Sequence, residues 1–115
     1  MDDWSFSDEH LLLQIESRPE NPYSVNITFL THQGQLYVVC VYAEESRWGR
    51  YLQETPEARL KIDGRIYPGR VTLVEDPVLI DEMIDPYAAK YPSLFEDSTQ
   101  EEVERFWYFR VDSTS

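Results

Sequence analysis

The sequence predicts a mainly β protein, a small antiparallel barrel with a few peripheral helices. Three observations support this prediction: apolar and polar residues alternate over several short segments, turn signals join these segments as hairpins, and helix signals occur in only a few places. The resulting order is five or six strands, with one short helix between two hairpins and a helical excursion before the last strand. Hairpin-built sheets of this kind close readily into barrels, because closure removes exposed strand edges.

The chain of 115 residues is expected to form one domain, spanning residues 10–115, behind a flexible acidic N-terminal segment, residues 1–9. His10–Glu16 is apolar but too short to distinguish a strand from a helical turn. Residues 18–22 contain two prolines, which bias their neighbours away from helix, so we expect a loop there.

The first predicted hairpin surrounds Gln33–Gly34. Tyr23–Leu30 alternates apolar and polar residues, and Gln35–Tyr42 is a second and more apolar segment. A short turn between two such segments is typical of an antiparallel pair. We therefore expect Tyr23–Leu30 and Gln35–Tyr42 to be two strands of one hairpin.

A short helix and a second hairpin follow. Ser46 is a good helix cap and Pro56 cannot continue a helix, so a helix is expected between them. Asp63–Gly64 then separates two alternating segments, Ala58–Ile62 and Arg65–Val74. Asp-Gly in this position is among the strongest short-range signals for a tight hairpin turn.

The C-terminal part is predicted to be helical before it returns to the sheet. Pro77–Tyr91 contains Pro86, so we expect two short helices rather than one. Thr99–Glu102 has the pattern of a capping box, which predicts a last helical turn. Phe106–Val111 closes the chain as an aromatic strand that is apolar on both faces. Its outer face needs a cover, and a second copy of the chain is the simplest one.

Charge is distributed unevenly along the chain. The formal net charge is −12, yet residues 46–74 hold six bases and three acids, a net of +3 between two acidic flanks. Such an island has two explanations: its bases pair with the protein's own carboxylates, or they bind an anionic group from outside. The bases are Arg47, Arg50, Arg59, Lys61, Arg65 and Arg70.

The composition argues against several function classes. The acidic balance disfavours duplex DNA and an anionic membrane surface as partners, and no segment has the length of a membrane span. The N-terminus lacks the features of a signal peptide and the single Cys40 excludes an internal disulfide, so we expect a cytoplasmic location. Cys40, His10 and His32 are too few soft ligands for structural zinc, and no pattern predicts a catalytic triad.

One long segment, from His32 to Asp76, resembles a known pattern. A strand is followed by a short helix that carries a tryptophan and ends near Thr-Pro, then by a strand, a Gly-Arg turn and a returning strand; here these places hold Trp48, Leu52, Thr55, Pro56, Gly64, Arg65, Tyr67 and Arg70. This succession is similar to the flavin- and deazaflavin-binding split barrels, the superfamily of pyridoxamine phosphate oxidase. It is most similar to the small deazaflavin-dependent nitroreductase-like branch. Residues 87–95 and 106–111 also resemble that branch, so the resemblance covers nearly the whole chain.

The resemblance implies a homodimer of six-stranded split barrels, with a flavin-type cofactor, FMN or the deazaflavin F420, in a groove between the subunits. It implies that bases from the loop after the first strand and from the short helix hold the cofactor's phosphate. It also implies that the flanking strands border the ring system. The residues that it indicates are Arg18, Asn26, Tyr42, Ser46, Arg47, Trp48 and Arg50.

Two functions follow as hypotheses. The first is a flavin- or deazaflavin-dependent oxidoreductase that acts on a small organic acceptor, in which the cofactor carries the chemistry and no side chain is the reacting group. The second is a cofactor-free split-barrel dimer that acts as a binding or interaction module. The second is favoured by residues 17–21, where Arg18 is the only base and Glu20 adds a negative charge.

The residues of the short helix allow alternative interpretations. Arg47 and Arg50 are three residues apart and share a helix face beside free N–H groups, which suits a phosphate. The alternative is that they neutralise nearby carboxylates, those of Glu44, Glu45 and Glu54. Trp48 either stacks on a ring cofactor or anchors the helix to the barrel, and anchoring is favoured because so short a helix needs a large buried side chain.

Overall fold

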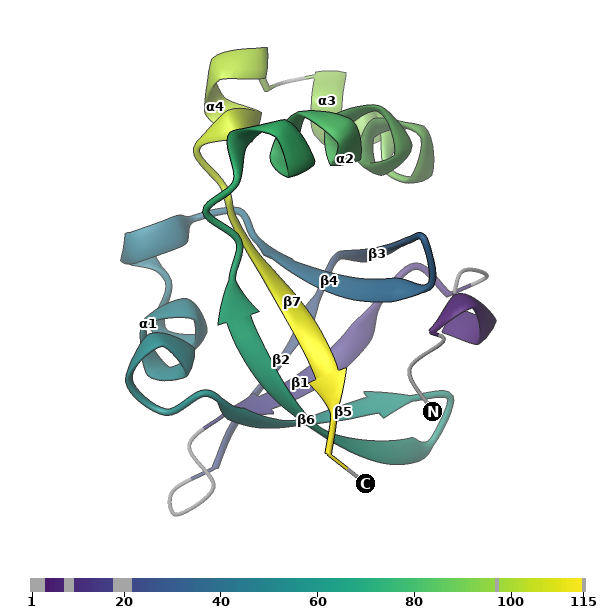
Figure 1. The fold of residues 1–115 in the computed structure, drawn as a ribbon, viewed down its shortest axis with the longest axis vertical. Coiled ribbons are helices and arrows are strands. Elements are labelled where there is room, and N and C mark those ends of the chain that lie inside the picture. Colours follow the sequence, from purple (N-terminus) through teal and green to yellow (C-terminus); the bar gives the residue numbers. More distant parts are fainter. Residues whose placement is uncertain (1–3, 8–9, 18–21, 97, 115) are drawn as a thin grey trace.

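The computed structural model describes residues 4–7, 10–17, 22–96 and 98–114, without the side chains of residues 5, 94, 95 and 100. In this part of the chain, one antiparallel sheet curls into a barrel, with α1 at its side and α2, α3 and α4 over one end (Figure 1). The strands are β1 (Leu13–Ser17), β2 (Tyr23–Ile27), β3 (Phe29–His32), β4 (Gln35–Cys40), β5 (Glu57–Ile62), β6 (Arg65–Leu73) and β7 (Trp107–Ser113). The helices are η1 (Ser5–Ser7), η2 (Ala43–Glu45), α1 (Arg47–Glu54), α2 (Pro77–Lys90), α3 (Pro92–Glu96) and α4 (Gln100–Glu104). The predicted mainly β fold with peripheral helices is confirmed.

The prediction of a single strand over Tyr23–Leu30 is wrong. The segment divides at Thr28 into β2, which pairs with β1, and β3, which pairs with β4 around the predicted turn. This division makes a seven-stranded sheet in the described residues, in the order β2-β1-β5-β6-β7-β4-β3, where six strands are expected. An alternating pattern reports which residues face the core, and it carries no information on where a strand changes partner.

The bend at Thr28 also brings the two ends of the sheet together. The carbonyl of Thr28 accepts a hydrogen bond from the backbone N–H of Val39 at 3.2 Å. Because β2 and β3 are consecutive in the chain and lie at opposite ends of the strand order, this contact closes most of the barrel and leaves a seam beside β2.

The second hairpin has the predicted form. Asp63 and Gly64 both have positive φ, 52° and 80°, and β5 and β6 pair on either side of them with Ile62 opposite Arg65. Two consecutive positive φ values are those of a primed turn, whose twist matches that of the strands. Along β5, alternate residues are buried and exposed, so the exposed positions carry the charges.

The barrel interior is filled by inward-facing residues of every strand. Each fully buried aliphatic or aromatic side chain contributes about 1.5–3 kcal/mol relative to its exposed state. Trp48 and Leu52 of α1 belong to the same apolar cluster, so the helix and the barrel share one core. The buried strand residues of this cluster are Leu13, Ile15, Ile27, Phe29, Leu36, Val38, Cys40, Ala58, Leu60, Ile62, Val71, Phe109 and Val111.

A second apolar layer covers the outer face of β3, β4 and β7. Phe106 and Tyr108 pack there against Met83 and Tyr87 of α2 and Val103 of α4. The Tyr108 hydroxyl donates to the carbonyl of Val103 at 2.9 Å. The expectation that a second copy covers this face is therefore wrong, because the chain's own helices fold back onto it.

Two tyrosines attach α2 to the corner between β2 and β3. The hydroxyls of Thr28 and Tyr87 lie 2.7 Å apart. The Tyr91 hydroxyl accepts from the backbone N–H of Phe29 at 3.1 Å and donates to the carbonyl of Leu11 at 2.6 Å. These contacts satisfy backbone groups at the end of the sheet and position the helical layer.

The expected break at Pro86 is also wrong, because α2 is continuous from Pro77 to Lys90 with Pro86 inside it. Pro86 is exposed, whereas Met83, Ile84 and Tyr87 are buried against the sheet. The carbonyl that loses its partner to proline therefore lies on the solvent side, and burial of the opposite face holds the helix together.

The capping-box prediction near the C-terminus is confirmed, whereas part of the N-terminal segment is packed and does not have the expected flexibility. The capping box is confirmed, since Thr99 accepts from the backbone N–H of Glu102 at 3.1 Å at the start of α4. Within residues 1–9, expected to be flexible, Trp4 is 3% exposed and belongs to the barrel core. Its backbone N–H donates to the carbonyl of Gly34 at 2.9 Å, so residues 4–7 pack against the end of the barrel.

No helix in the described part of the chain combines the length and apolar character needed to cross a membrane.

Candidate functional site

The short helix α1 begins and ends where the sequence predicts. Ser46 precedes it with extended backbone angles, φ −89° and ψ 132°, and Thr55 follows its last turn, with Pro56 immediately beyond. Trp48, Gly49 and Leu52 face the barrel, whereas Arg47 and Arg50 are exposed. The helix thus presents its cationic face away from the core.

The start of α1 lies directly over Cys40. The Ser46 side chain makes no capping hydrogen bond to the helix backbone, and the Cys40 thiol beneath it donates to the carbonyl of Ala43 at 3.7 Å. Burial raises the pKa of the Cys40 thiol, against the smaller opposite effect of its hydrogen bonds. The first N–H groups of α1 therefore lack the side-chain acceptor that a helix cap normally supplies.

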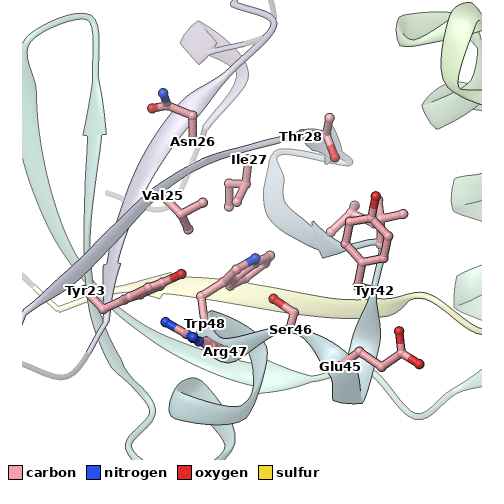
Figure 2. Close-up of a pocket in the computed structure, with 12 residues that line it drawn as sticks. Tyr23, Val25, Asn26, Ile27, Thr28, Tyr42, Glu45, Ser46, Arg47 and Trp48 are labelled. Carbon is pink, nitrogen blue, oxygen red and sulfur yellow. The ribbon is translucent and has the colours of Figure 1, made fainter.

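A groove of about 530 Å³ runs along the seam between β2, the end of β4 and the start of α1. Figure 2 shows Arg47 and Trp48 on one side of the groove, facing Tyr23 and Val25 of β2, and Tyr42 at its other end. This volume lies within the range of small-molecule and cofactor sites, about 300–1,000 Å³. The lining residues are Tyr23, Val25, Asn26, Ile27, Thr28, Val39, Val41, Tyr42, Glu45, Ser46, Arg47 and Trp48.

The groove brings together five of the seven residues that the resemblance indicates: Asn26, Tyr42, Ser46, Arg47 and Trp48. Arg50 is exposed on α1 and does not line the groove. Arg18 lies outside the described residues. Asn26 lines the groove from the far face of β2, so its side chain points away from Trp48 (Figure 2).

The edge of β2 forms one wall. Residues 25–28 line the groove consecutively, so both faces of the strand border it, and β2 pairs with β1 on one side only. Backbone N–H and C=O groups of a strand edge are strong donors and acceptors that require partners. This wall can therefore hydrogen-bond a planar heterocycle that carries both donors and acceptors.

The arginines of the cationic island differ in their partners. Arg59 pairs with Glu16 and Arg70 pairs with Glu57, both on the exposed face of the sheet. Within the described ranges, Arg47 and Arg50 form no ion pair with Glu44, Glu45, Glu54 or any other acid. Pairing with the protein's own carboxylates therefore explains the hairpin bases Arg59 and Arg70. It does not explain the two arginines of α1, which can bind an external anion.

Trp48 is primarily an anchor. It is 7% exposed, and its ring lies 6.1 Å from that of Phe109 inside the barrel. Only a small part of the indole reaches the groove, so it can border a ring there without offering a full stacking face.

Several groove residues were not indicated by sequence, among them Tyr23, Val25 and Thr28. The alternation of β2 places Tyr23 and Val25 on the core side, and nothing in the pattern shows that the strand leaves its neighbour after Ile27. The sequence indicates Glu45 only as a charge near Arg47, whereas the structure places it among the residues that line the groove.

The chemistry available in the groove is that of binding. The described residues contain no group of three or more His, Cys, Asp or Glu side chains placed to hold a metal ion. Arg47, Ser46 and the start of α1 can bind an anion at one end of the groove, and the β2 edge can hydrogen-bond a heterocycle along its wall. Such an arrangement can hold a phosphorylated aromatic cofactor.

Comparison with known proteins identifies the fold. No protein-family model matches the chain, and no curated protein matches it in sequence. Among solved structures, HutZ, the heme storage protein from Vibrio cholerae, has a TM-score of 0.75 at 15% identity, covering 96% of this chain and 87% of that one. An F420-H2-dependent reductase has a TM-score of 0.70 at 13% identity, covering 90% and 95%.

A third similar structure is a candidate pyridoxamine 5′-phosphate oxidase from Listeria innocua. Its TM-score is 0.69 at 16% identity, covering 93% of this chain and 86% of that one. Identities this low show a shared fold and leave the activity open. The expected split-barrel fold is thus confirmed.

Proposed function

From a chain with the flavin-binding split-barrel fold, we propose an oxidoreductase that binds FMN or the deazaflavin F420 in the groove between β2 and α1 and acts on a small organic acceptor. The observation that carries this proposal is the groove itself. Five residues indicated by the family resemblance line one groove of cofactor size, at the start of a helix whose first N–H groups have no side-chain cap. The similarity to an F420-H2-dependent reductase supports the same choice of cofactor class.

The phosphate would lie at the start of α1. Arg47 supplies a guanidinium with no acidic partner among the described residues, and Ser46 leaves the first N–H groups of α1 without a side-chain cap. A helix N-terminus carries about half a positive charge, which favours an anion. Ser46 would add a further contact. Arg18 and Arg50 are proposed as phosphate-binding residues on the family resemblance alone.

The ring system would lie along β2. The free strand edge offers backbone donors and acceptors to the polar side of the ring, and Trp48 and Tyr42 border it at the two ends of the groove. Among the residues proposed to border the ring, Asn26 has the least support, because its side chain points to the other face of β2 (Figure 2). The backbone at Asn26 is the part that can contact a ligand.

The residues of this chain would bind, orient and shield, and the bound cofactor would supply the hydride or electron transfer. Burial of the Val25 and Ile27 side chains provides an apolar floor that excludes water from one side of the ring. No general acid, base or nucleophile is required of the protein in this scheme.

We also propose that the protein works as a homodimer in which a second copy closes the open side of the groove. The groove runs between β2 and α1, and Tyr42 on its rim is 72% exposed, which leaves a surface that a second copy could cover. A mass of twice the 13.6 kDa chain in light scattering would support this, and a monomer that binds the cofactor tightly would contradict it.

The second candidate function, a cofactor-free binding module, is favoured by one observation. Glu45 lies on the rim of the groove, and Arg47 is the only base among the lining residues described. A carboxylate beside a phosphate weakens binding, so a chain of this charge can keep the fold without the cofactor.

Titration with FMN and with F420 distinguishes the two functions. A cofactor that binds the folded state raises the melting temperature, since ligand binding adds to the stability of that state. Arg47→Glu should weaken the binding by about 10- to 100-fold, because a charge-assisted hydrogen bond contributes about 1.5–3 kcal/mol. Arg65→Glu, the same change at an exposed position of the β5–β6 hairpin, serves as the matched control and should leave the affinity unchanged.

The oxidoreductase proposal is refuted if neither cofactor raises the melting temperature. It also fails if Arg47→Glu and Arg65→Glu reduce the affinity equally, because the effect would then be one of net charge and would not report a phosphate contact.

A further inference from the structure

Thr28 connects the groove to the helical layer. It lies at the corner between β2 and β3, where it lines the groove beside α1 (Figure 2). Its hydroxyl lies 2.7 Å from the hydroxyl of Tyr87, a residue of α2. One hydrogen bond between two side chains therefore joins the groove to a helix that contributes none of the lining residues described.

Tyr87 holds its hydroxyl in a fixed place. The side chain is fully buried, and its ring makes edge contacts with those of Tyr91 and Tyr108, at centroid distances of 5.3 and 6.3 Å. Tyr91, one turn further along α2, is itself bonded to the backbone of Phe29. Because the phenol is packed on all these sides, it cannot follow a partner that rotates away. Thr28 must therefore keep one side-chain orientation to retain the bond.

The direction of this hydrogen bond follows from the acidity of the two groups. A phenol, with an ordinary pKa of about 10, is a stronger acid than an aliphatic alcohol and hence the stronger donor. This difference favours donation from Tyr87 to the oxygen of Thr28. The proton of the Thr28 hydroxyl is then left for a second acceptor, and the groove is the open space that Thr28 lines.

The alternative is a purely structural role for this hydrogen bond. A buried tyrosine hydroxyl needs a partner, and Tyr108 has one in the carbonyl of Val103. Tyr91, however, already attaches α2 to the same corner of the sheet. Tyr87 differs from both of these tyrosines, which bond to backbone groups, because its partner is a side chain that lines a groove.

We propose that Tyr87 is a positioning residue of the cofactor groove, which orients the Thr28 hydroxyl so that this group donates to an acceptor atom on the ring of the bound cofactor. The inference rests on the proposed function, because a ring along β2 is the acceptor that it requires. The ring systems of FMN and of F420 both carry carbonyl oxygens that can accept. A hydroxyl that is oriented before the ligand arrives loses less conformational entropy on binding than a freely rotating one. The helical layer thereby becomes part of the binding site.

Four single variants separate this positioning role from a structural one. Each is titrated with whichever of FMN and F420 binds the wild-type chain, at a temperature where the variant is folded. Thr28→Val removes the donor and should weaken binding by about 3- to 10-fold, whereas Thr28→Ser keeps the hydroxyl and should stay within about twofold of the wild type. Tyr87→Phe should weaken binding by about 2- to 5-fold. Tyr108→Phe removes a buried phenol hydrogen bond from the same layer, so it is the matched control and should leave the affinity unchanged.

The double variant Thr28→Val/Tyr87→Phe shows whether the two residues act through one contact. If Tyr87 acts by orienting Thr28, its replacement should have no further effect once the Thr28 hydroxyl is absent. The double variant should then bind the cofactor as Thr28→Val does, within about twofold. A structural role of Tyr87 predicts instead that the two losses of affinity multiply.

The orientation of Thr28 can be measured without any cofactor. Three-bond couplings from its methyl carbon to the backbone nitrogen and carbonyl carbon report the side-chain torsion angle. They should indicate one rotamer in the wild type and in Tyr108→Phe, and an average over rotamers in Tyr87→Phe. Loss of stability alone would not change this angle in a chain that is still folded.

The inference is overturned if Thr28→Val binds the cofactor as tightly as the wild type. It is also overturned if Tyr87→Phe and Tyr108→Phe weaken binding equally, or if Thr28 keeps one rotamer without the Tyr87 hydroxyl. In each of these cases the wild-type chain still binds its cofactor, and the proposed function stands. If neither FMN nor F420 binds the wild-type chain, the proposed function and this inference are both refuted.

Discussion

Gly49 is the residue of α1 whose replacement most directly tests how this helix is seated. In an exposed helix, Gly→Ala stabilises by about 1 kcal/mol, because glycine loses the most backbone entropy on folding. Here the structure predicts the opposite sign. A Cβ atom at position 49 would lie 2.8 Å from Cys40 Sγ and 3.2 Å from Trp107 Cε3. Cys40 is fully buried, so its sulfur cannot swing away into solvent.

The expected change in the free energy of unfolding for Gly49→Ala is the difference between two opposing contributions. Overpacking of a well-packed core costs about 1–3 kcal/mol. The gain in helix propensity offsets about 1 kcal/mol of this cost. Gly49→Ala should therefore lower the free energy of unfolding by about 1 kcal/mol, and by up to about 2 kcal/mol if the surrounding side chains do not relax. For a domain of this size, a change of 1 kcal/mol shifts the melting temperature by about 4 °C.

Urea denaturation of a double-mutant cycle measures the contact. Cys40→Ala removes the sulfur that the new methyl group would contact. The steric clash with Cys40 would then no longer cancel the gain in helix propensity. Gly49→Ala in the Cys40→Ala background should be neutral or stabilising, with a coupling energy of about 1–2 kcal/mol between the two sites. Because Ser46 and Arg47 lie at the start of α1, the single variant should also weaken cofactor binding.

The reasoning is refuted if Gly49→Ala alone stabilises the protein by the full propensity gain. It is equally refuted if the two substitutions are additive within about 0.3 kcal/mol, since residues that are not in contact behave in that way. Either result would mean that α1 lies farther from β4 than the structure places it.

Two further predictions concern the tyrosines under the helical layer. Tyr91→Phe should lower the free energy of unfolding by about 1–3 kcal/mol, because the hydroxyl satisfies the backbone of Phe29 at the end of β3 and its loss leaves those groups unpaired; an unchanged urea midpoint would show that water replaces it. Stability should also fall as the pH rises above about 10, since burial raises the pKa of both Tyr87 and Tyr108 above that of an unfolded tyrosine. In the unfolded chain these phenols lose their protons first, so their contribution is complete below pH 10 and is lost towards the folded pKa values, at up to about 1.4 kcal/mol per pH unit for each group. The fall of the denaturation midpoint across this range should become less steep in Tyr87→Phe and in Tyr108→Phe, although Tyr37 and Tyr91, whose pKa values burial also raises, keep part of it. A slope that neither substitution reduces would contradict the assignment.

The sequence by itself determined the local features of this protein. The Asp63–Gly64 turn, the start of α1 after Ser46 and the capping box at Thr99 all appear where they were predicted. Each depends on a few consecutive residues whose backbone preferences and hydrogen bonds do not require the rest of the fold. The family resemblance likewise indicated residues of α1 and its neighbouring strands, because the pattern extends along one continuous segment.

Only the tertiary structure decided the contacts between distant segments. It divided Tyr23–Leu30 between two partners, kept α2 continuous through Pro86 and covered Tyr108 with the chain's own helices. These outcomes depend on which surface a segment meets, and burial of a whole face outweighs a single lost hydrogen bond or a local turn preference.

The same division applies to the candidate site. The sequence showed a cationic island, but it could not show that Arg59 and Arg70 are paired whereas Arg47 faces a groove without an acidic partner among the described residues. Pairing depends on strand register, which brings Glu16 opposite Arg59 from a position 43 residues away. The sequence therefore shows where positive charges gather along the chain. Only the folded barrel decides which of these charged side chains are free to contact a ligand.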